Sequence, residues 1–308
     1  GPLKTIVARH TSRFGYLALL APILAAGTVT AILIFRDQTL AAALDASSFK
    51  TTVGPALSWF DEHIRYERLF TTSPDGSVAR RFAVLTLLLA LAVSLAMSLR
   101  KGRIPGTAAG PARRIVGITI ISFLAMMFTP TKWTHHFGVF AGLAGSLGAL
   151  AAIAVGTVAM RSRRNRAMFA ATVLFVMALS FATVNGWWYV SSYGVPFNND
   201  MVAVGGIKLS TIFLVLFVIT AVWAFWLHFN SDRPEGRLTR LVTAAPIPLA
   251  AAFMVVVCVA SMAIGAVREY PTYSNLASNL RALKGGCGLA DNVLVEPDSN
   301  AGFLTPQP

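Results

Sequence analysis

The most chemically varied stretch of the sequence is Thr129 to His136, which lies between two apolar runs and is called the polar segment below. Lys132, Trp133, His135 and His136 fall within five consecutive positions of it. Lysine and histidine side chains suit a phosphate or phosphodiester, because they donate charge-assisted hydrogen bonds. An indole face suits a sugar ring. The segment is therefore a candidate binding site for a phosphorylated sugar.

The depth of the polar segment in a membrane supports this interpretation. The preceding apolar run, Ile115 to Phe128, has only 14 residues, or about 21 Å of helix, against a hydrocarbon core of about 30 Å. Pro130 then ends the helix. Unless the two arginines before the run snorkel deeply, the polar segment begins below the outer surface, where non-helical backbone needs protein or a water-filled cavity around it. We expect it to cap an outward-opening cavity, with Trp133 and His135 pointing inward.

A plainer interpretation remains open for these residues. Trp133 would anchor the chain in the aromatic belt of the membrane interface, Lys132 would lie among lipid headgroups, and both histidines would be solvated. Ionisable groups clustered within a membrane are costly unless they are used, which favours a binding site for the cluster as a whole.

Small and aromatic residues near the polar segment also allow two interpretations. Gly138, Gly142 and Gly145 share one face of the following helix, where packing against a neighbouring helix is the expected role and contact with an acyl chain the alternative. Trp187 and Trp188 end the next apolar run on the same outer face. They are typical of an interfacial belt, and a sugar-binding platform is the alternative.

The elements that must position these residues are membrane-spanning helices. Apolar residues make up 55% of the 308-residue chain, charged residues only 13%, and the mean hydropathy is +0.64, which is far from the composition of a soluble domain. The sequence predicts an all-α, polytopic transmembrane bundle. Its seven expected spans are residues 14–35, 82–99, 115–128, 137–160, 167–188, 209–229 and 247–267.

The charges between these spans alternate and predict an orientation. Loops assigned to the inside carry 15 Lys and Arg against 2 Asp and Glu, whereas the outer loops carry 11 of each kind. The positive-inside rule then places the N-terminus of the chain in the cytoplasm and its C-terminus outside, in a multi-pass protein of the plasma membrane. This distribution also explains the basic pI without a nucleic-acid partner.

Two outer regions complete the expected organisation. Residues 1–270 form the membrane region, and residues 271–308 begin an outer C-terminal region. Within the outer loop 36–81, the stretch Val53 to Phe70 predicts an amphipathic helix that opens near Pro55 and lies along the surface. The chain has no initiating Met, and we expect it to be a piece of a longer protein.

The sequence shows no motif for a cofactor, a metal or a catalytic constellation. Cys258 lies inside an apolar run and is expected to be inert packing. Cys287, on the outer side, suggests a partner thiol that is missing. Cofactor and catalytic residues therefore stay unassigned, and no metal site is expected.

Six longer stretches of the sequence are distinctive when taken together. They are residues 34–39 (IFRDQT), 63–69 (HIRYERL), 100–106 (RKGRIPG), 128–148 (FTPTKWTHHFGVFAGLAGSLG), 184–188 (VNGWW) and 287–296 (CGLADNVLVE). These stretches resemble one family, the mycobacterial cell-wall arabinosyltransferases, or Emb proteins, which are the targets of ethambutol. The resemblance covers essentially the whole chain and is more specific than any short motif.

This resemblance implies a part of a GT-C-class glycosyltransferase. The family moves arabinofuranose from decaprenyl-phosphoryl arabinose to cell-wall arabinan on the outer side of the membrane. Trp133 and His135 match positions lining the donor and ethambutol pocket, and Gln38 matches a position associated with drug resistance. The family's catalytic aspartate lies in an outer loop nearer the N-terminus, which no part of this chain matches.

The expected substrate- or inhibitor-binding residues are therefore Trp133, His135, Lys132, His136, Gln38 and Trp188. Expected partners are the lipid donor, the arabinan acceptor, ethambutol, membrane lipid and a homologous subunit, with no nucleic acid. The rival function is a non-enzymatic lipid or sugar transporter, or a membrane scaffold. Transporters often contain internal repeats and paired broken spans, whereas this sequence shows one short span and no repeat.

Overall fold

The computed structural model describes residues 38–54, 56–158, 162–187, 193–230, 245–270 and 275–287, together with isolated positions elsewhere. It divides into two compact units, Gly1–Trp59 and Phe60–Pro308. The first unit contains α3 (Leu40–Val53). The Thr39 side chain caps the start of this helix by accepting a hydrogen bond from the Ala42 amide, and Gly54 ends it with a φ of +79°, an angle that favours glycine.

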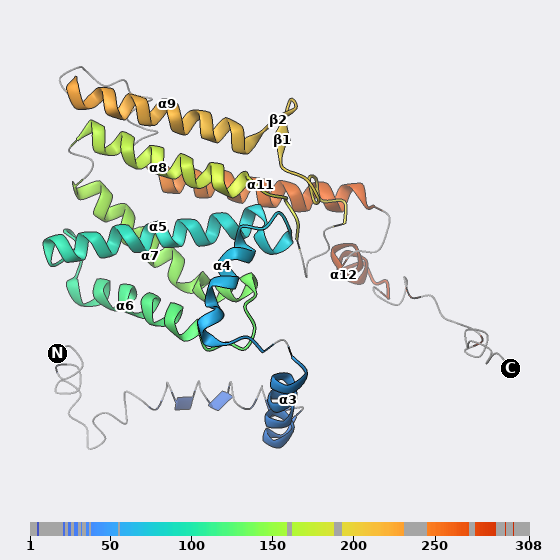
Figure 1. Cartoon of the computed structure of the whole chain (residues 1–308). Coiled ribbons are helices and arrows are strands. Elements are labelled where there is room, and N and C mark those ends of the chain that lie inside the picture. Colours follow the sequence, from blue (N-terminus) through green and yellow to red (C-terminus); the bar gives the residue numbers. More distant parts are fainter. Residues whose placement is uncertain are drawn as a thin grey trace. The chain divides into compact units, whose positions relative to one another are not determined.

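The second unit is built from helices that lie roughly along one another (Figure 1). The long ones are α5 (Val78–Lys101), α6 (Ala109–Met126), α7 (Ala141–Val158), α8 (Arg163–Phe181), α9 (Leu209–Phe229) and α11 (Pro246–Arg268). The shorter elements are η1 (Trp59–Glu62, which begins at the last residue of the first unit), α4 (His63–Leu69), η2 (Pro74–Gly76), η3 (Thr134–Phe140) and α12 (Asn275–Leu283). A small antiparallel hairpin joins β1 (Ala203–Val204) to β2 (Ile207–Lys208).

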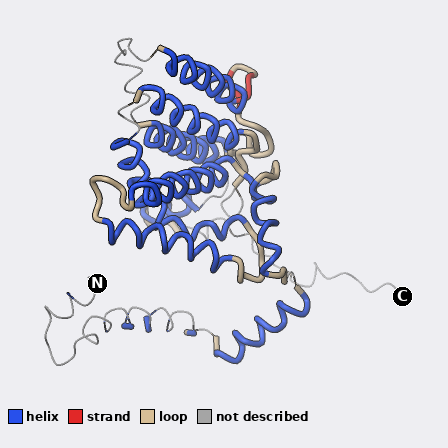
Figure 2. Tube along the Cα trace, turned by 60° about the vertical axis from the view of Figure 1, so that its left-hand side comes forward, coloured by secondary structure: helices blue, strands red, loops and turns tan. Residues whose placement is uncertain are grey.

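Helices α5 and α8 are the centre of this unit. α5 packs against α6, α7 and α8, and α8 packs in turn against α9 and α11. Figures 1 and 2 both show α9 lying along α8 on the side away from α6. The order of contacts therefore runs from α6 and α7, through α5 and α8, to α9 and α11.

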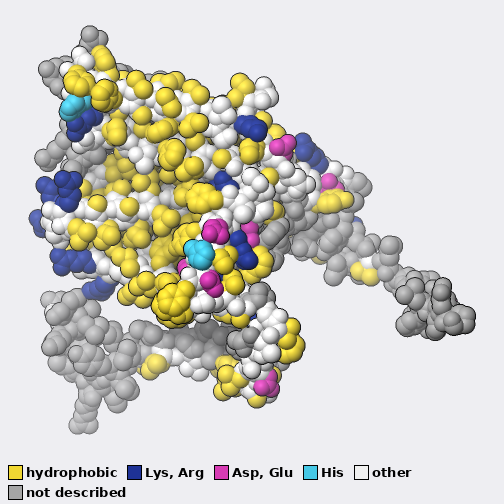
Figure 3. Space-filling model, viewed as in Figure 1, with side chains coloured by type: hydrophobic (Ala, Val, Ile, Leu, Met, Phe, Trp, Pro, Cys, Tyr) yellow, Lys and Arg dark blue, Asp and Glu magenta, His cyan; other side chains and the backbone are white. Residues whose placement is uncertain are grey.

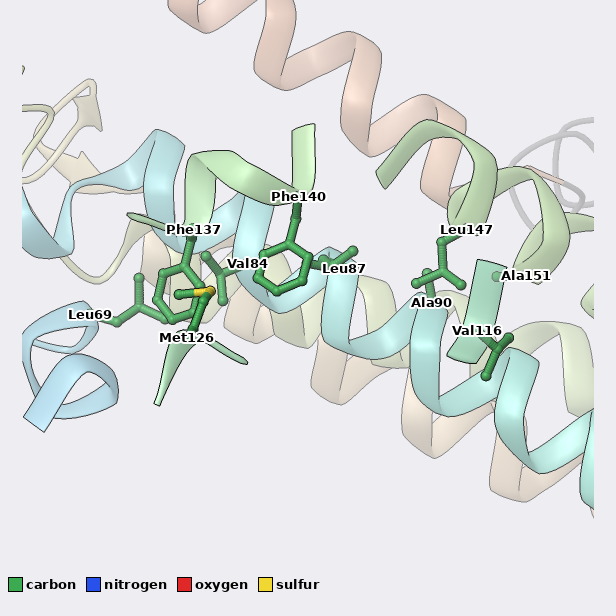
Figure 4. Close-up of a cluster of buried hydrophobic side chains, with 10 residues drawn as sticks. All are labelled: Leu69, Val84, Leu87, Ala90, Val116, Met126, Phe137, Phe140, Leu147 and Ala151. Atoms are coloured by element: carbon green, nitrogen blue, oxygen red, sulfur yellow. The ribbon is translucent and has the colours of Figure 1, made fainter. Parts of the chain in front are cut away.

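The apolar core beside the polar segment joins α4, α5, α6, η3 and α7. Figure 4 shows its side chains converging from these elements. Phe140 of η3 stacks on Phe123 of α6 with a centroid distance of 4.2 Å, and Phe137 meets Tyr66 edge-on at 5.6 Å. Fully buried side chains of this kind supply most of the stabilisation of a fold. The ten buried residues are Leu69, Val84, Leu87, Ala90, Val116, Met126, Phe137, Phe140, Leu147 and Ala151.

Five segments of the described chain are long and apolar enough to cross a membrane: α5, α6, residues 134–156, α9 and α11. The multi-pass, mostly helical prediction is confirmed at that level. The predicted spans 82–99, 209–229 and 247–267 fall on α5, α9 and α11. The first predicted span, 14–35, lies almost wholly outside the described residues. The fifth, 167–188, corresponds to α8, which ends at Phe181 and is not among the five.

Two sequence predictions differ from the structure. The helix that carries the third predicted span, α6, begins at Ala109 rather than Ile115 and has 18 residues, about 27 Å of helix. It is therefore nearly long enough to cross the hydrocarbon core of about 30 Å, so the polar segment need not begin deep in the membrane. The continuous outer helix predicted over Val53 to Phe70 is also absent. The stretch contains η1, a non-helical Asp61 (φ −82°, ψ 17°) and the seven-residue α4.

Basic side chains gather at one end of the helices, where α5 ends and α6 and α8 begin. Figure 3 shows this end as dark blue at the left of the view, with Asp and Glu side chains in magenta elsewhere on the visible face. The grouping matches the predicted charge asymmetry, while the direction of insertion stays a prediction. The residues concerned are Arg100, Lys101, Arg103, Arg113, Arg114, Arg163, Arg164 and Arg166.

Candidate functional site

The polar segment connects α6 to α7 at the end of the unit opposite the basic cluster. α6 tightens before Pro130, since the amides of Met127, Phe128 and Thr129 bond to carbonyls three residues back. Residues 130–133 are non-helical, and η3 then leads into α7. η3 contacts α4, η2 and the start of α5. Because Pro130 ends the helix, the chain that carries Lys132, Trp133, His135 and His136 lies against α4, η2 and α5.

Arg65 of α4 fixes the backbone of this segment. Its side chain is fully buried and pairs with Glu62, with 2.7 Å between Nε and Oε1. It donates to the hydroxyl of Thr129 at 2.7 Å and lies 2.8 Å from Nδ1 of His136. A buried guanidinium needs such a set of acceptors, because an unpaired charge there would be strongly destabilising. Arg65 also donates to three backbone carbonyls, those of Met126, Thr131 and Trp133.

Lys132 lies inside the protein and holds the same segment. Its side chain is 0% exposed. Its ammonium group donates to the carbonyls of Met127 at 2.6 Å and Thr129 at 3.0 Å, and lies 3.3 Å from the Glu62 carboxylate. Glu62 is thus shared by Lys132 and Arg65. The structure places this lysine, predicted to bind a ligand phosphate, within a buried ion triad.

Trp133 and His135 lie closer to solvent. The indole of Trp133 is partly buried, and the guanidinium carbon of Arg68 is 4.3 Å from its ring centroid, within the range of a cation–π interaction. The exposed imidazole of His135 lies nearly parallel to the indole, at 6.4 Å between centroids and 22° between planes. His136 meets His135 edge-on at 4.5 Å. The structure therefore groups three of the predicted site residues.

A second polar cluster, which the sequence analysis missed, surrounds Asp75 of η2. Asp75 is 4% exposed and accepts from Arg80 of α5 at 3.0 Å and from the hydroxyl of Thr134 at 2.6 Å. Arg80 also donates to that hydroxyl at 3.0 Å. The turn Pro74–Asp75–Gly76 is the only sequence signal for it. Nothing in the sequence shows that this turn meets a segment nearly sixty residues later.

A groove of about 330 Å³ opens between the start of α5, η3 and the start of α7. Its polar lining comes from Arg80, Thr134 and His135, and the rest is apolar. The remaining lining residues are Ala79, Ala83, Val84, Leu87, Phe137, Gly138, Phe140, Ala141 and Ala144. Trp133 is not among the residues that line this groove. The expected cavity under the polar segment is thus a groove beside it, and His135 alone of the predicted pair borders it.

The glycine face of α7 does not pack against another helix in the described part of the chain. A methyl group added at Gly138, Gly142, Gly145 or Gly148 would meet no other atom within 4 Å. The expected role in helix packing is therefore not seen for these glycines, and Gly138 instead borders the groove.

The other predicted residues lie elsewhere. Gln38 is exposed just before α3, in the first unit, and Trp188 falls outside the described residues. Cys258 is partly buried in α11 and Cys287 is exposed. Across the ranges that the structure describes, no group of three or more His, Cys, Asp or Glu side chains is arranged to hold a metal ion.

Comparisons with known proteins agree over the whole chain. Residues 1–230 match a family described as mycobacterial cell wall arabinan synthesis protein, and residues 259–308 match one described as EmbC C-terminal domain. A probable arabinosyltransferase C of Mycolicibacterium smegmatis is 67% identical over 312 residues, which cover 99% of the chain and 29% of the relative. The corresponding protein of Mycobacterium tuberculosis H37Rv is 62% identical over 99% of the chain and 29% of the relative.

The fold has a solved relative as well. The cryo-EM structure of arabinosyltransferase EmbB from Mycobacterium smegmatis matches with a TM-score of 0.69 and 50% identity, covering 100% of the chain and 27% of that protein. The chain thus spans less than a third of the length of these relatives.

Proposed function

The chain belongs to the family of mycobacterial cell-wall arabinan synthesis proteins, and from that premise we propose that it is the membrane-embedded part of an arabinosyltransferase. The intact protein moves arabinofuranose from decaprenyl-phosphoryl arabinose to arabinan on the outer side of the plasma membrane. Relatives named arabinosyltransferases B and C, at 53% and 67% identity, support the activity. The residue resemblance described above supports the donor.

The observation that carries this proposal is the groove beside the polar segment. A lipid-linked sugar phosphate needs an apolar channel for its chain and cationic donors for its phosphate. The groove combines apolar walls from α5, η3 and α7 with Arg80 and His135 in its lining. His135 donates to the donor phosphate, and Trp133, which Arg68 and His135 flank, offers its indole to the sugar. Lys132 supports the segment from within, rather than contacting the donor.

The reaction is a displacement at the anomeric carbon of the arabinofuranose. An acceptor hydroxyl attacks that carbon, the bond from the carbon to the phosphate oxygen breaks, and the lipid phosphate leaves. A carboxylate takes the proton of the hydroxyl, and cationic side chains stabilise the charge that develops on the leaving phosphate. The carboxylate belongs to the part of the intact enzyme that precedes this chain. Asp75 does not take that role, since it is 4% exposed and its Oδ1 already accepts from both Thr134 and Arg80.

The finer predictions belong to this proposal. Ethambutol competes at the Trp133 and His135 region, with Gln38 affecting its action from the first unit. A homologous subunit is the expected partner, and the start of the chain faces the cytoplasm. Trp188 stays a candidate sugar contact, and His136, held by Arg65, positions the segment.

The test is transfer by the full-length protein in lipid nanodiscs. Synthetic polyprenyl-phosphoryl arabinose labelled in the sugar is supplied with an arabinan oligosaccharide. We expect the acceptor to gain label and one polyprenyl phosphate to form per arabinose transferred. Movement of intact donor across the bilayer, without a labelled product, would instead support the transporter.

A further inference from the structure

The guanidinium of Arg80 is held at one end only. Both hydrogen bonds that it makes to described residues, to Asp75 and to Thr134, use Nη1 at 3.0 Å. The side chain is 21% exposed, whereas the Asp75 side chain is 5% exposed. A guanidinium carries five N–H donors in a rigid fork. Asp75 and Thr134 therefore orient Arg80 through Nη1, and the N–H groups on Nε and Nη2 are available to a ligand.

The partners of Arg80 are themselves fixed. Thr134 is 1% exposed, and its hydroxyl lies 2.7 Å from the Asp75 carbonyl and 2.6 Å from the Asp75 carboxylate. Gly76, next to Asp75, leaves no room for a methyl group beside the carbonyls of Leu69 and Thr71. The turn that carries Asp75 is thus packed tightly, and it presents the carboxylate to Arg80 in a defined position.

Other basic side chains that surround the polar segment are used within the protein. Arg65 and Lys132 are 0% exposed and share Glu62. Arg81 is 3% exposed and donates to backbone carbonyls, and Arg68 lies over the Trp133 ring. Arg80 is the arginine that lines the groove, and its side chain shares the groove lining with His135.

We propose that Arg80, oriented by Asp75 and Thr134, binds the phosphate of a polyprenyl phosphate whose first isoprene units lie in the groove between α5, η3 and α7. The inference deepens the proposed function and rests on it. Arginine suits this role because its planar fork contacts two phosphate oxygens at once, which a lysine cannot do. The alanines and Gly138 along the groove leave space for a methyl-branched chain.

Binding measurements on the full-length protein in nanodiscs test this inference. The probes are decaprenyl phosphate and the uncharged decaprenol, which differ only in the phosphate. Variants are Arg80→Gln and Arg80→Lys, and Arg103→Gln is the matched control, because Arg103 is exposed at the opposite, basic end. Phosphatidylglycerol serves as a competitor to separate a polyprenyl phosphate from an ordinary lipid headgroup.

We expect Arg80→Gln to weaken decaprenyl phosphate binding by about ten- to a hundredfold, the loss of a charge-assisted hydrogen bond. Arg80→Lys should recover part of that loss. Decaprenol binding should stay within about twofold of wild type in every variant, which also shows that the groove has folded, and Arg103→Gln should change neither. Equimolar phosphatidylglycerol should not displace decaprenyl phosphate.

Other outcomes separate this inference from the proposed function. If Arg80→Gln binds decaprenyl phosphate as wild type does, or loses both probes equally, Arg80 does not bind the phosphate, although the transferase proposal stands as long as wild type transfers arabinose. Displacement by equimolar phosphatidylglycerol overturns the polyprenyl assignment. If the wild-type protein binds neither decaprenyl phosphate nor decaprenol, then the groove is not a polyprenyl-binding site and the proposed lipid donor is also contradicted.

Discussion

At the scale of single residues, the polar segment separates into a buried half and an exposed half. Lys132 and the backbone of the segment are held by Glu62 and Arg65. Trp133 and His135 lie outward of that framework. Buried ion pairs contribute little net stability, but they set one geometry, because breaking one leaves an uncompensated charge. The buried triad therefore acts on the position of the exposed residues rather than on the ligand.

A first prediction concerns the exposed half. In the full-length enzyme, His135→Ala removes a phosphate donor and Trp133→Ala a sugar contact. Each should lower the rate of arabinose transfer from a synthetic polyprenyl-phosphoryl donor by about ten- to a hundredfold. Protein yield should change little, because neither side chain fills the core. Val139→Ala, an exposed neighbour, is the control. Full activity in both variants would leave the cluster as an interfacial belt.

A second prediction concerns the buried half. Lys132→Met leaves Glu62 paired with Arg65 alone and deprives the carbonyls of Met127 and Thr129 of their charged donor. It should cost about 1.5–3 kcal/mol of stability, seen as a lower midpoint of thermal unfolding in detergent. The double variant Glu62→Gln, Lys132→Met should recover none of that loss, since it leaves the buried Arg65 guanidinium without its carboxylate. If Lys132→Met unfolds like wild type and loses only donor affinity, Lys132 is a ligand contact after all.

At the scale of elements, short segments join the helices where the site lies. Arg81, the fourth residue of α5, donates to the carbonyls of Leu69, the last residue of α4, and of Thr71 just beyond it. It also donates to the carbonyls of Leu179 and Ala182 at the end of α8. One side chain thus connects the start of α5 to the C-terminal ends of α4 and α8, where helix carbonyls need partners from outside the helix. The groove wall on α5 is placed by this connection.

We therefore predict that Arg81→Met destabilises the protein by about 2 kcal/mol or more, because buried carbonyls lose a charged donor. Arg81→Lys should restore part of the stability. Thermal unfolding in detergent gives the comparison, with Arg103→Met as the control for charge alone. Equal unfolding midpoints for Arg81→Met and Arg103→Met would show that the connection is not needed.

Glycines of two elements should respond in opposite ways to the same substitution. A methyl group at Gly142 of α7 meets no atom within 4 Å, whereas one at Gly76 collides with backbone carbonyls. Gly142→Ala should be neutral or stabilising by up to about 1 kcal/mol, since alanine favours helix. Gly76→Ala should be clearly destabilising, by more than about 2 kcal/mol. Unfolding midpoints measured in parallel test the pair. A destabilising Gly142→Ala would indicate a covering partner on the α7 face.

At the scale of the whole molecule, charge and hydropathy organise the second unit. The basic ends of α5, α6 and α8 gather on one side, and the polar segment lies at the other ends of α5 and α6 (Figures 1 and 3). A membrane-impermeant thiol reagent tests the orientation. In a background with both cysteines replaced by serine, Thr72→Cys should be labelled from outside and Gly110→Cys only after permeabilisation, because positive loops stay inside. The reverse pattern would contradict the assigned topology.

The sequence by itself determined the protein class, the approximate spans and the location of the polar segment. Hydropathy is a property of the local sequence and does not depend on distant residues. The apolar runs that form α5, α9 and α11 are therefore predicted within a few residues. Proline at position 130 marked the end of α6 in the same local way. The exact ends of the helices did not follow from hydropathy alone. α6 begins before Arg113 and Arg114, because a helix can continue through charged residues whose side chains reach the membrane interface.

Only the tertiary structure decided what the polar side chains do. Lys132 and His135 are three residues apart and chemically similar, yet one is buried against Glu62 and the other lines a groove. Arg80 and Asp75 meet Thr134 across more than fifty positions, a contact that no local pattern encodes. A side chain's type limits the chemistry it can do. Burial and partners, which come from elements distant in sequence, decide whether it pairs inside the protein or faces a ligand.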